Sequence, residues 1–411
     1  MSLFTELKWR NMIKDISDEK QVQELLDNSK IKFYCGFDPT GQSLTIGHLV
    51  QIVRMMFLAK HGHQPVVLVG GATGLIGDPR ETTERSLLSL EESLHNAQMI
   101  EKQIKKYLGK TAIFVNNYDW LKDVSLISFL RDYGKHFPIN YMLAKDTIAK
   151  RLETGISYTE FSYMLLQSID FHYLYKNHNV KLQFGGSDQW GNITAGLELI
   201  RKLEGKNDAV GLSSPLLLKS DGAKFGKSET GAIWLDQSLT SAYEIYQYFI
   251  NTADNDIENY LKSLTLLSKE EIINLINENK KDLSKRLAAK KLAEEVVLLI
   301  HGEKALKEAL SITQALFSND FSNLDITAFN SLVRLYGSFN VKDESSVLDI
   351  LTNTKLVSSN REAREFVSQN AIMINDTKVT DLNQTIADFD AYHQKYFIVK
   401  RGKKKFAVLV K

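Results

Sequence analysis

The sequence predicts an α/β protein with a Rossmann-type parallel-sheet domain, then a helical domain and a small α+β domain. Apolar, strand-like runs at residues 32–37, 65–68, 112–116 and 180–184 alternate with segments of helical periodicity, which is typical of a parallel sheet. All five prolines lie at or before Pro215, and the pattern is strongly helical from Ser241 onward. From Ser345, helical segments are followed by short strands with many basic residues. These three observations set the predicted architecture.

The same shifts in pattern predict where the domains begin and end. Residues 1–220 form the Rossmann-type catalytic domain, and residues 221–318 form a loop followed by the helical domain. Residues 319–344 are polar and weakly patterned, so we expect a linker there. Residues 345–411 form the small basic domain.

The composition is that of an ordinary globular protein, with 43% hydrophobic residues, 25% charged residues and a formal net charge of +1. Because this charge gives no global field for nucleic acid, any basic surface must be local. The single cysteine, Cys35, excludes an intrachain disulfide framework and fits a reducing compartment. The N-terminus lacks the apolar core of a secretory signal, and no run approaches the ~18 apolar residues of a membrane helix. We therefore expect a soluble, cytoplasmic protein.

Residues 32–49, KFYCGFDPTGQSLTIGHL, read as a strand, a turn and a helix, with Ser43 as a candidate N-cap. Such a helix directs its free N–H groups and its positive dipole end at the sheet edge, where a phosphate can bind. His48 lies about one turn inside, and Gly47 lets a flat ring approach the backbone. The stretch indicates a nucleotide site, although an ordinary βα corner has the same features.

Polar residues follow the other predicted strands, at the edge where parallel sheets bind ligands. A glycine-rich segment, residues 70–79, contains Asp78, which is either a turn residue or a ligand contact. The glycine spacing is not that of a dinucleotide fingerprint. Residues 117–120 follow the third strand, and GGSDQWGN, residues 185–192, follows the fourth.

In the long apolar helix predicted from Glu160 to Tyr175, the residues Tyr163, Gln167 and Asp170 fall on one face. Polar groups on an apolar helix must be paired or must line a cavity. A solvated stripe is the alternative, but the apolar residues around these three leave little room for it. We therefore favour a cavity.

The segment GAKFGKS, residues 222–228, is similar to a phosphate-binding P-loop. However, three residues separate its glycines where that motif needs four, and a strand-like pattern follows it. We therefore interpret it as a mobile loop that carries Lys224 and Lys227 to a ligand. A solvated surface turn is the alternative.

From Ser345 onward the chain has 11 Lys/Arg and 7 Asp/Glu residues, a local charge of +4. A small basic domain of helices followed by strands predicts contact with an RNA backbone. A solvated tail is the alternative, but apolar residues alternate around the charges and argue against it. The candidate RNA-binding residues are Arg361, Arg364, Lys400, Arg401, Lys403, Lys404 and Lys405.

Several motifs, taken in order, resemble those of one family. Thr45-Ile-Gly-His48 resembles the HIGH signature, and Lys224-Phe-Gly-Lys-Ser228 the KMSKS signature, of class I aminoacyl-tRNA synthetases. With FYCGFDPT, VGGATGLIGDP, TEFSYMLLQSIDF and GGSDQWGNI, the chain is similar to the bacterial tyrosyl-tRNA synthetases over essentially its whole length. The resemblance implies a ligase that activates L-tyrosine with ATP, accompanied by Mg²⁺, and transfers it to the 3′ end of tRNA(Tyr). It also implies a homodimer.

The resemblance implies roles for particular residues. Asp170 and Tyr34 would hold the phenolic hydroxyl of tyrosine, and its α-amino group would contact Tyr163, Gln167 and Asp78. Gln189 would complete the tyrosine site. The residues implied to bind ATP are Cys35, Gly36, Asp38, Gly47, His48, Asp188 and Lys227. The residues implied to act in catalysis are Thr40, His48, Lys224, Lys227 and Ser228, with no metal ligands among the protein's own residues.

The expected chemistry needs no general base, because the α-carboxylate of tyrosine is already ionised at neutral pH. The site need only align the reactants and stabilise charge on the phosphates. Thr45 stands where the family usually has the first histidine of the signature. If no other group supplies the hydrogen-bond donor of that histidine, this predicts a loss of reaction rate on the order of 10²-fold. The loop at residues 79–85 is also shorter than usual, which leaves the phosphate roles of Arg80 and Arg85 open.

Two other functions fit parts of the sequence. A tryptophanyl-tRNA synthetase has the same fold, but Asp170 beside Tyr34 and the basic C-terminal domain favour tyrosine. A non-catalytic paralogue that binds RNA is the other alternative, and Thr45 is the feature that favours it.

Overall fold

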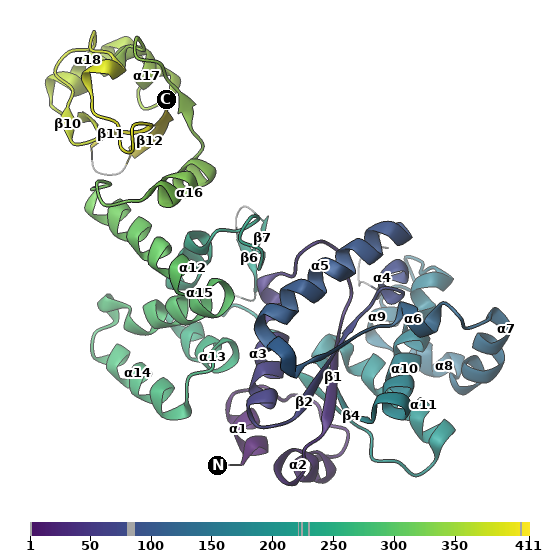
Figure 1. Ribbon diagram of the computed structural model, residues 1–411. Helices are drawn as coiled ribbons and strands as arrows, with labels where there is room; N and C mark the ends of the chain where they lie inside the picture. The colour runs from purple at the N-terminus through teal and green to yellow at the C-terminus, as the bar shows by residue number, and fades with distance from the viewer. Residues whose placement is uncertain (1, 80–86, 221, 223–224, 229–230, 403–404) are drawn as a thin grey trace. The chain divides into compact units, whose positions relative to one another are not determined.

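The computed structural model describes residues 2–79, 87–220, 222, 225–228, 231–402 and 405–411. They form two compact units, which are coloured along the chain in Figure 1. The first unit contains Met1–Thr240 and Tyr248–Ile300, and the second contains Ser241–Gln247 and His301–Lys411. No helix among the described residues combines the length and apolar character that crossing a membrane requires.

A parallel sheet in the strand order β3-β2-β1-β4-β5 forms the centre of the first unit. Its strands are β1 Lys32–Phe37, β2 Gln64–Val69, β3 Ile113–Asn116, β4 Val180–Gly186 and β5 Val210–Ser214. The order reverses between β1 and β4, which is the position where sheets of this type bind ligands. The Rossmann-type sheet and four of its strands were predicted, so the fold class is confirmed.

The strand β5 was not predicted, because its five residues, VGLSS, include only two large apolar side chains. All five are nevertheless buried. The hydroxyl of Ser213 donates to the carboxylate of Asp15, and that of Ser214 donates to the carbonyl oxygen of Gly185 at 3.1 Å. These bonds allow polar residues to occupy a buried strand at the edge of the sheet.

Helices cover both faces of this sheet (Figure 1). On one side, α3 Ile46–Lys60 and α5 Leu90–Leu108 contact β2, and on the other, α10 Tyr158–His178 and α11 Trp190–Glu204 contact β4. The helix α5 begins at a capping box formed by Ser89 and Glu92. The N-cap of α3 is Thr45, so the prediction of Ser43 was wrong. The Ser43 side chain is buried and donates to the carbonyl oxygen of Leu44 instead.

Shorter helices complete the first unit. They are α1 Leu3–Trp9, α2 Glu19–Asn28, α4 Thr73–Ile76, α6 Tyr118–Leu121, α7 Leu126–Ser128, α8 Ile139–Leu143, α9 Asp146–Ala149, α13 Asp254–Leu264 and α14 Lys269–Lys281. The buried guanidinium of Arg10 donates to the carbonyl oxygens of Lys262, Thr265 and Leu267 at the end of α13. It thereby ties the N-terminal helix to that part of the chain. The helices α12 Ala242–Ile250 and α15 Leu287–Ser318 each have residues in both units.

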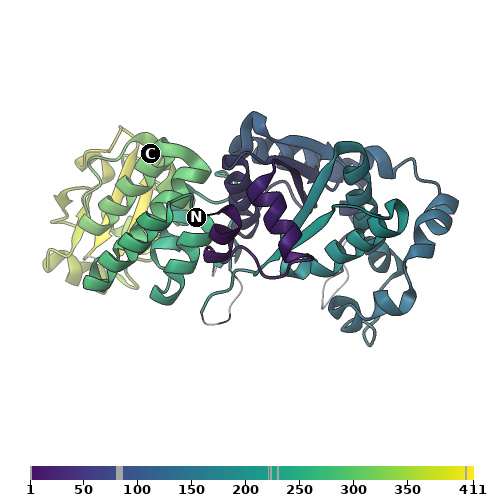
Figure 2. The same ribbon diagram turned by 90° about the horizontal axis from the view of Figure 1, so that it is seen from below.

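The second unit has a mixed sheet in the order β10-β9-β11-β12-β8. Its elements are α16 Ile326–Tyr336, β8 Phe339–Asn340, α17 Val347–Asn353, α18 Asn360–Ser368, β9 Ile372–Ile374, β10 Thr377–Lys378, β11 Tyr396–Arg401 and β12 Lys405–Val410. Helices pack on both faces of this sheet (Figure 2). Tyr396 and Ile398 of β11 join the core with α16, whereas Phe397 and Val399 join the core with α17 and α18.

Residues 319–344 do not form the predicted linker. They contain α16 and β8, and the side chains of Phe321, Leu324, Phe329 and Leu332 are buried in the core of the second unit. Phe329 and Leu332 lie three positions apart on one face of α16, and Phe321 and Leu324 lie in the segment just before it. The polar residues between them lowered the average hydrophobicity and hid the pattern.

Candidate active site

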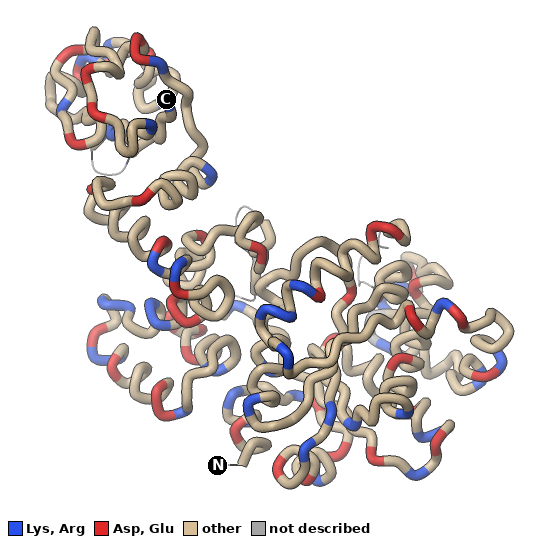
Figure 3. The backbone as a smooth tube through the Cα atoms, viewed as in Figure 1, with Lys and Arg blue, Asp and Glu red and all other residues tan. Residues whose placement is uncertain are grey.

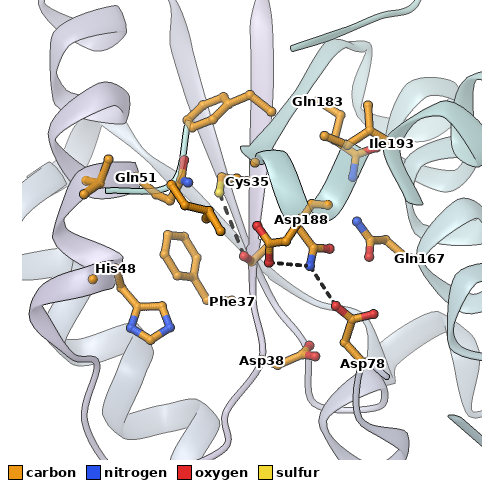
Figure 4. A pocket seen from close by; sticks show the side chains of 18 of the residues that line it. Cys35, Phe37, Asp38, His48, Gln51, Asp78, Gln167, Gln183, Asp188 and Ile193 are labelled. Atoms are coloured by element: carbon orange, nitrogen blue, oxygen red, sulfur yellow. Dashed lines mark hydrogen bonds between the residues drawn. The ribbon is translucent and has the colours of Figure 1, made fainter. Parts of the chain in front are cut away.

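A cavity of about 520 Å³ opens at the carboxyl ends of β1 and β4, where the strand order reverses. Figure 4 shows His48 and Gln51 on one wall, with Asp78 and Gln167 on the far side. The predicted site residues that line this cavity are Tyr34, Cys35, Gly36, Asp38, Thr40, Gly47, His48, Asp78, Tyr163, Gln167, Asp170, Asp188 and Gln189. The polar stripe on α10 therefore lines a cavity, as predicted.

One end of the cavity is built around Asp170. Its two carboxylate oxygens accept hydrogen bonds from Asn117 Nδ2 at 2.9 Å and from Trp120 Nε1 at 2.8 Å. Burial raises the pKa of Asp170 to about 8, although the two hydrogen bonds oppose that shift. The Trp120 ring stacks on Tyr173 at 4.3 Å between centroids, which fixes the indole in place. Asn117 and Trp120 follow β3, where polar residues had indicated a ligand edge, but their partner is Asp170.

The hydroxyl of Tyr34 lies at the same end of the cavity. Tyr34 is only 1% exposed, and no described residue forms a hydrogen bond with its hydroxyl oxygen. The ring is held against Phe171 at 5.4 Å between centroids. Because an unpaired buried hydroxyl is unfavourable, its place in a cavity wall indicates a partner supplied by a ligand.

A hydrogen-bond chain connects the two sides of the cavity. Asn117 Nδ2 also donates to the Thr73 hydroxyl at 2.9 Å, and that hydroxyl donates to Asp38 at 2.8 Å. The other carboxylate oxygen of Asp38 accepts from the hydroxyl of Tyr163 at 2.7 Å. An added Cβ at Gly70 would lie 2.1 Å from an Asp38 oxygen, so this glycine makes room for the chain.

Asp78 lies across the cavity from His48 (Figure 4). Its oxygens accept from Gln189 Nε2 at 2.7 Å and from Asn192 Nδ2 at 3.2 Å. Burial raises the pKa of Asp78 to about 6, with further increases from Asp38 and Asp188, while the two amide donors act in the opposite direction. A carboxylate in this state would be stabilised by a cationic group in the cavity.

Two glutamine side chains have unused acceptors facing the cavity. The Oε1 atoms of Gln167 and Gln183 are buried and have no hydrogen-bond partner among the described residues. Sequence reasoning identified Gln167 from its position on α10 and missed Gln183 in the middle of β4. A glutamine inside an otherwise apolar strand was the available signal, because a buried amide requires partners.

The N-terminus of α3 forms another part of the cavity wall. Nδ1 of His48 accepts from the backbone N–H of Thr45 at 3.1 Å and lies 3.0 Å from the Thr45 hydroxyl oxygen. The surrounding protein lowers the pKa of His48, which favours the neutral ring. With Nδ1 accepting, the remaining proton is on Nε2, which can donate to a ligand. Thr45 thus orients His48 and caps the helix.

The loop with the KMSKS-like residues is anchored next to this helix start. Phe225 packs on Tyr260 at 5.0 Å between centroids, and the N–H of Gly226 donates to the hydroxyl of Tyr248 at 3.0 Å. The backbone N–H of Ile46 donates to the carbonyl oxygen of Ile233 at 2.8 Å. The loop therefore returns along the first turn of α3.

Two of the predicted catalytic residues in this loop have a described backbone. Lys227 and Ser228 form β6 Lys227–Ser228, which pairs with β7 Gly231–Ala232. Lys224, Arg80 and Arg85 lie outside the described residues.

The predicted RNA-binding residues differ in exposure. Arg361 and Arg364 on α18 and Lys405 on β12 are exposed, and Arg401 pairs with Glu362 at 2.8 Å. Basic and acidic residues are interspersed along the second unit (Figure 3). Lys403 and Lys404 lie outside the described residues.

Lys400 is not a surface residue. It is 3% exposed, and its Nζ donates to the carbonyl oxygen of Asn319 at 2.9 Å. The prediction that Lys400 contacts RNA was wrong, because the alternation of β11 turns this side chain toward Phe321 in the core.

Two family models match the chain. The model of class I tRNA synthetases of the tryptophan and tyrosine group matches residues 26–318, which include the sheet and the cavity. The model of the tyrosine–tRNA ligase SYY-like C-terminal domain matches residues 331–409. The fold is thus that of the class I aminoacyl-tRNA synthetases.

Full-length relatives give the same result. The chain is 55% identical to the tyrosine–tRNA ligase of Onion yellows phytoplasma (strain OY-M), with 100% of both chains covered. It is 48% identical to tyrosine–tRNA ligase 1 of Enterococcus faecalis (strain V583 among others), over 99% of this chain and 98% of that protein. A crystal structure of a C-terminally truncated Aspergillus nidulans mitochondrial tyrosyl-tRNA synthetase matches with a TM-score of 0.68 and 30% identity, covering 77% and 94% of the two chains. The chain belongs to the tyrosine–tRNA ligase family.

Proposed function

We propose that the cavity in the first unit binds L-tyrosine and ATP, forms tyrosyl-adenylate and passes the tyrosyl group to the 3′ end of tRNA(Tyr). The observation that carries this assignment is the pair formed by the unpartnered, buried hydroxyl of Tyr34 and the buried carboxyl of Asp170. A phenolic hydroxyl can donate to Asp170 and accept from Tyr34. Phenylalanine would leave the Tyr34 hydroxyl unpaired and would donate no hydrogen bond to Asp170, which favours tyrosine.

The amino-acid backbone of the substrate would lie toward Asp78. The α-ammonium group would contact Asp78 and the Oε1 acceptor of Gln167, while the hydroxyl of Tyr163 is held in place by Asp38. Gln189 and Asn192 hold the Asp78 carboxylate by donating to its oxygens. In this proposal Asp38 and Gln189 act mainly by positioning Tyr163 and Asp78.

ATP would lie along the wall formed by β1 and the N-terminus of α3. The free N–H groups of that helix, Thr40 and the Nε2–H of His48 would face the phosphates. Next to them along the wall, the ribose would face Cys35, Gly36, Gly47 and Asp188. Burial raises the pKa of the Cys35 thiol to about 12, so it acts as a neutral group. The side chains of Lys224, Lys227 and Ser228 would reach the phosphates from the loop.

The first step of the reaction requires that the site align the carboxylate of tyrosine with the α-phosphorus of ATP. A carboxylate oxygen of tyrosine attacks the α-phosphorus, the bond to the β-phosphate oxygen breaks, and pyrophosphate leaves with the electron pair. Donors at the helix N-terminus and on the loop stabilise the charge that develops on the phosphates. In the second step a ribose hydroxyl at the 3′ end of the tRNA attacks the tyrosyl carbonyl carbon, and AMP leaves.

Mg²⁺ accompanies ATP in this proposal. Among the residues that the structure describes, no group of three or more His, Cys, Asp or Glu side chains is placed to hold a metal ion. We therefore expect the ion to be bound mainly by phosphate oxygens and water and to neutralise part of their charge.

We further propose that the second unit contacts tRNA and that the protein acts as a homodimer in the cytoplasm. Arg361, Arg364 and Lys405 are exposed and could pair with phosphates. The exposed apolar residues Leu126, Ile127, Leu130 and Ile139, in and beside the segment from Phe129 to Lys145, support a subunit interface. Light scattering of the purified protein would measure the dimer directly. The cytoplasm supplies ATP and tRNA and fits a chain with one free thiol.

The test is amino-acid-dependent ATP–pyrophosphate exchange with tyrosine, phenylalanine and tryptophan. We expect exchange with tyrosine and strong loss in Asp170→Asn, because an amide cannot accept from both Asn117 and Trp120 and also from the phenol. Exchange driven by tryptophan in preference to tyrosine would overturn the assignment. In Thr45→His we expect only a modest gain, since Thr45 already orients His48.

A further inference from the structure

The chain between β5 and the KMSKS-like residues leaves the cavity wall and then returns to it. Leu218 lines the cavity before the loop, and Phe225 lines it at the far end of the loop. Both residues contact Tyr260, which is buried on α13. The Tyr260 hydroxyl donates to the carbonyl oxygen of Leu218 at 3.1 Å, and the Tyr260 ring packs on Phe225 at 5.0 Å between centroids. Tyr260 therefore contacts both ends of the loop.

Asp256 binds the loop from the same face of α13. It lies four positions before Tyr260, so the two side chains are neighbours on the helix surface. Its Oδ2 atom accepts from the backbone N–H of Ser220 at 3.1 Å and from the Ser220 hydroxyl at 3.2 Å. Hydrogen bonds to a carboxylate are stronger than those between neutral groups. Asp256 and Tyr260 thus fix the first side of the loop, from Leu218 to Ser220.

The position of Asp256 in its helix does not by itself explain its burial. A carboxylate in the first turn of a helix is favoured by the free N–H groups and the helix dipole, and the exposed Asp254 already occupies that turn. Asp256 is only 9% exposed. Burying a carboxylate is unfavourable unless hydrogen bonds replace those to water, and Ser220 supplies such bonds. The contact with the loop therefore explains the buried carboxylate better than the helix dipole does.

The same helix relates the loop to the proposed phosphate site. The helix α13 packs against α3, whose N-terminus forms part of the cavity wall (Figure 1). At the far end of the loop, Gly226 lies against the first turn of α3, where an added Cβ would approach Ile46 Cγ2 to 2.8 Å. Lys227 follows Gly226 directly. An anchor on α13 thus sets where this part of the chain lies relative to the N-terminus of α3.

We propose that Asp256 and Tyr260 are positioning residues for adenylate formation, which fix the loop so that its two lysines reach the phosphates of ATP. This inference rests on the proposed function and names the residues that place the loop. Neither residue is among the described residues that line the cavity, so neither should contribute to tyrosine binding. Because charge on the phosphates develops in the transition state, a misplaced loop should lower kcat more than it raises KM.

The experiment measures tyrosine-dependent ATP–pyrophosphate exchange in Asp256→Ala, Asp256→Asn and Tyr260→Phe. We expect kcat to fall about tenfold in Asp256→Ala and about threefold in Tyr260→Phe, which keeps the ring but loses the hydroxyl. Asparagine keeps an acceptor oxygen, so Asp256→Asn should stay within about threefold of native. The KM for tyrosine should stay within about twofold of native throughout. Asp254→Ala, in the same turn of α13, is the matched control and should leave kcat unchanged.

A double variant tests whether Asp256 acts through Ser220. Ser220→Ala removes one of the two donors from an exposed residue and should lower kcat about threefold. In combination with Asp256→Ala it should cause no further loss, because the hydroxyl contributes only through the carboxylate. Losses that multiply would show that the two residues act independently, which would contradict the proposal.

Amide hydrogen exchange separates positioning from a structural role. The Ser220 N–H should exchange faster in Asp256→Ala than in the native chain, and at the native rate in Asp254→Ala. An unchanged kcat, an equal rise in the KM for tyrosine, or an equal loss in Asp254→Ala would each overturn the proposal. If Asp256→Ala does not fold, Ser220→Ala and Tyr260→Phe provide the same test. If the native chain shows no pyrophosphate exchange, the proposed function fails, and an unchanged rate at the Ser220 N–H would then refute the anchor separately.

Discussion

Replacing Tyr34 with phenylalanine should stabilise the empty protein and weaken tyrosine binding. The hydroxyl is buried, and no described residue forms a hydrogen bond with it. An unsatisfied buried polar group costs about 1–3 kcal/mol, so its removal should raise the free energy of unfolding by about 1 kcal/mol after the lost contacts are subtracted. For a unit of this size that corresponds to about 2–4 °C in melting temperature. The stability gain would come from the same unpaired hydroxyl that we propose binds the phenol.

In the complex the hydroxyl has a partner, so the same substitution removes a hydrogen bond. One neutral hydrogen bond contributes about 0.5–1.5 kcal/mol, which corresponds to tyrosine affinity lower by about two- to tenfold. The free amino acid phenylalanine has no hydroxyl to bond with position 34, so its affinity should not fall in the variant. The preference for tyrosine over phenylalanine should therefore drop by the same two- to tenfold factor. The assays are calorimetric unfolding and equilibrium binding of both amino acids.

Tyr107→Phe is the matched control, because Tyr107 on α5 also has a buried hydroxyl without a partner in the described part of the chain. It should stabilise the protein similarly and leave tyrosine binding unchanged. Tyr175→Phe removes a hydroxyl that donates to Asp208 at 2.9 Å and should not stabilise. If Tyr34→Phe melts below the native protein, or binds tyrosine as tightly, the reasoning is wrong.

Three further predictions follow from other contacts. The pKa of Asp78 is raised to about 6 in the empty site, and a bound ammonium group favours the ionised carboxylate. Tyrosine affinity should therefore fall by up to about tenfold per pH unit as the pH drops below 6. Binding titrations at several pH values check this, and an affinity that does not change with pH would contradict it. Arg10→Met should lower the unfolding free energy by about 3 kcal/mol in urea, since three carbonyl oxygens lose their donor, whereas the exposed Lys8→Met should change it by less than about 1 kcal/mol. Tyr248→Phe removes the hydroxyl that accepts from the Gly226 N–H and should lower kcat of exchange about three- to tenfold. Tyr243→Phe on the same helix should leave kcat unchanged. Equal effects of the two substitutions would refute a role of Tyr248 in placing the loop.

Local patterns in the sequence determined the first unit's architecture. Four strands and the helices between them were predictable because periods of two and 3.6 residues show which side chains face a core. The shared face of Tyr163, Gln167 and Asp170 followed from the same geometry. In each case the deciding residues lie within one element.

Tertiary structure decided what depends on partners from distant elements. Ser213 and Ser214 occupy a buried edge strand because Asp15 and Gly185 complete their hydrogen bonds, and no local pattern contains that information. The burial of Lys400 depends on what packs against its face of β11, and the linker prediction at 319–344 failed for the same reason.

In the candidate site, too, some features could be predicted from the sequence and others depend on tertiary structure. The shared helix face identified Asp170 from the sequence, and the position after a strand identified Asp78. Their donors, Trp120 and Gln189, come from other elements at separations of 50 and 111 residues. Burial and neighbouring charge set a pKa, so these shifts exist only once the chain has folded. The sequence determined which groups are present, and packing determined their partners and their charge.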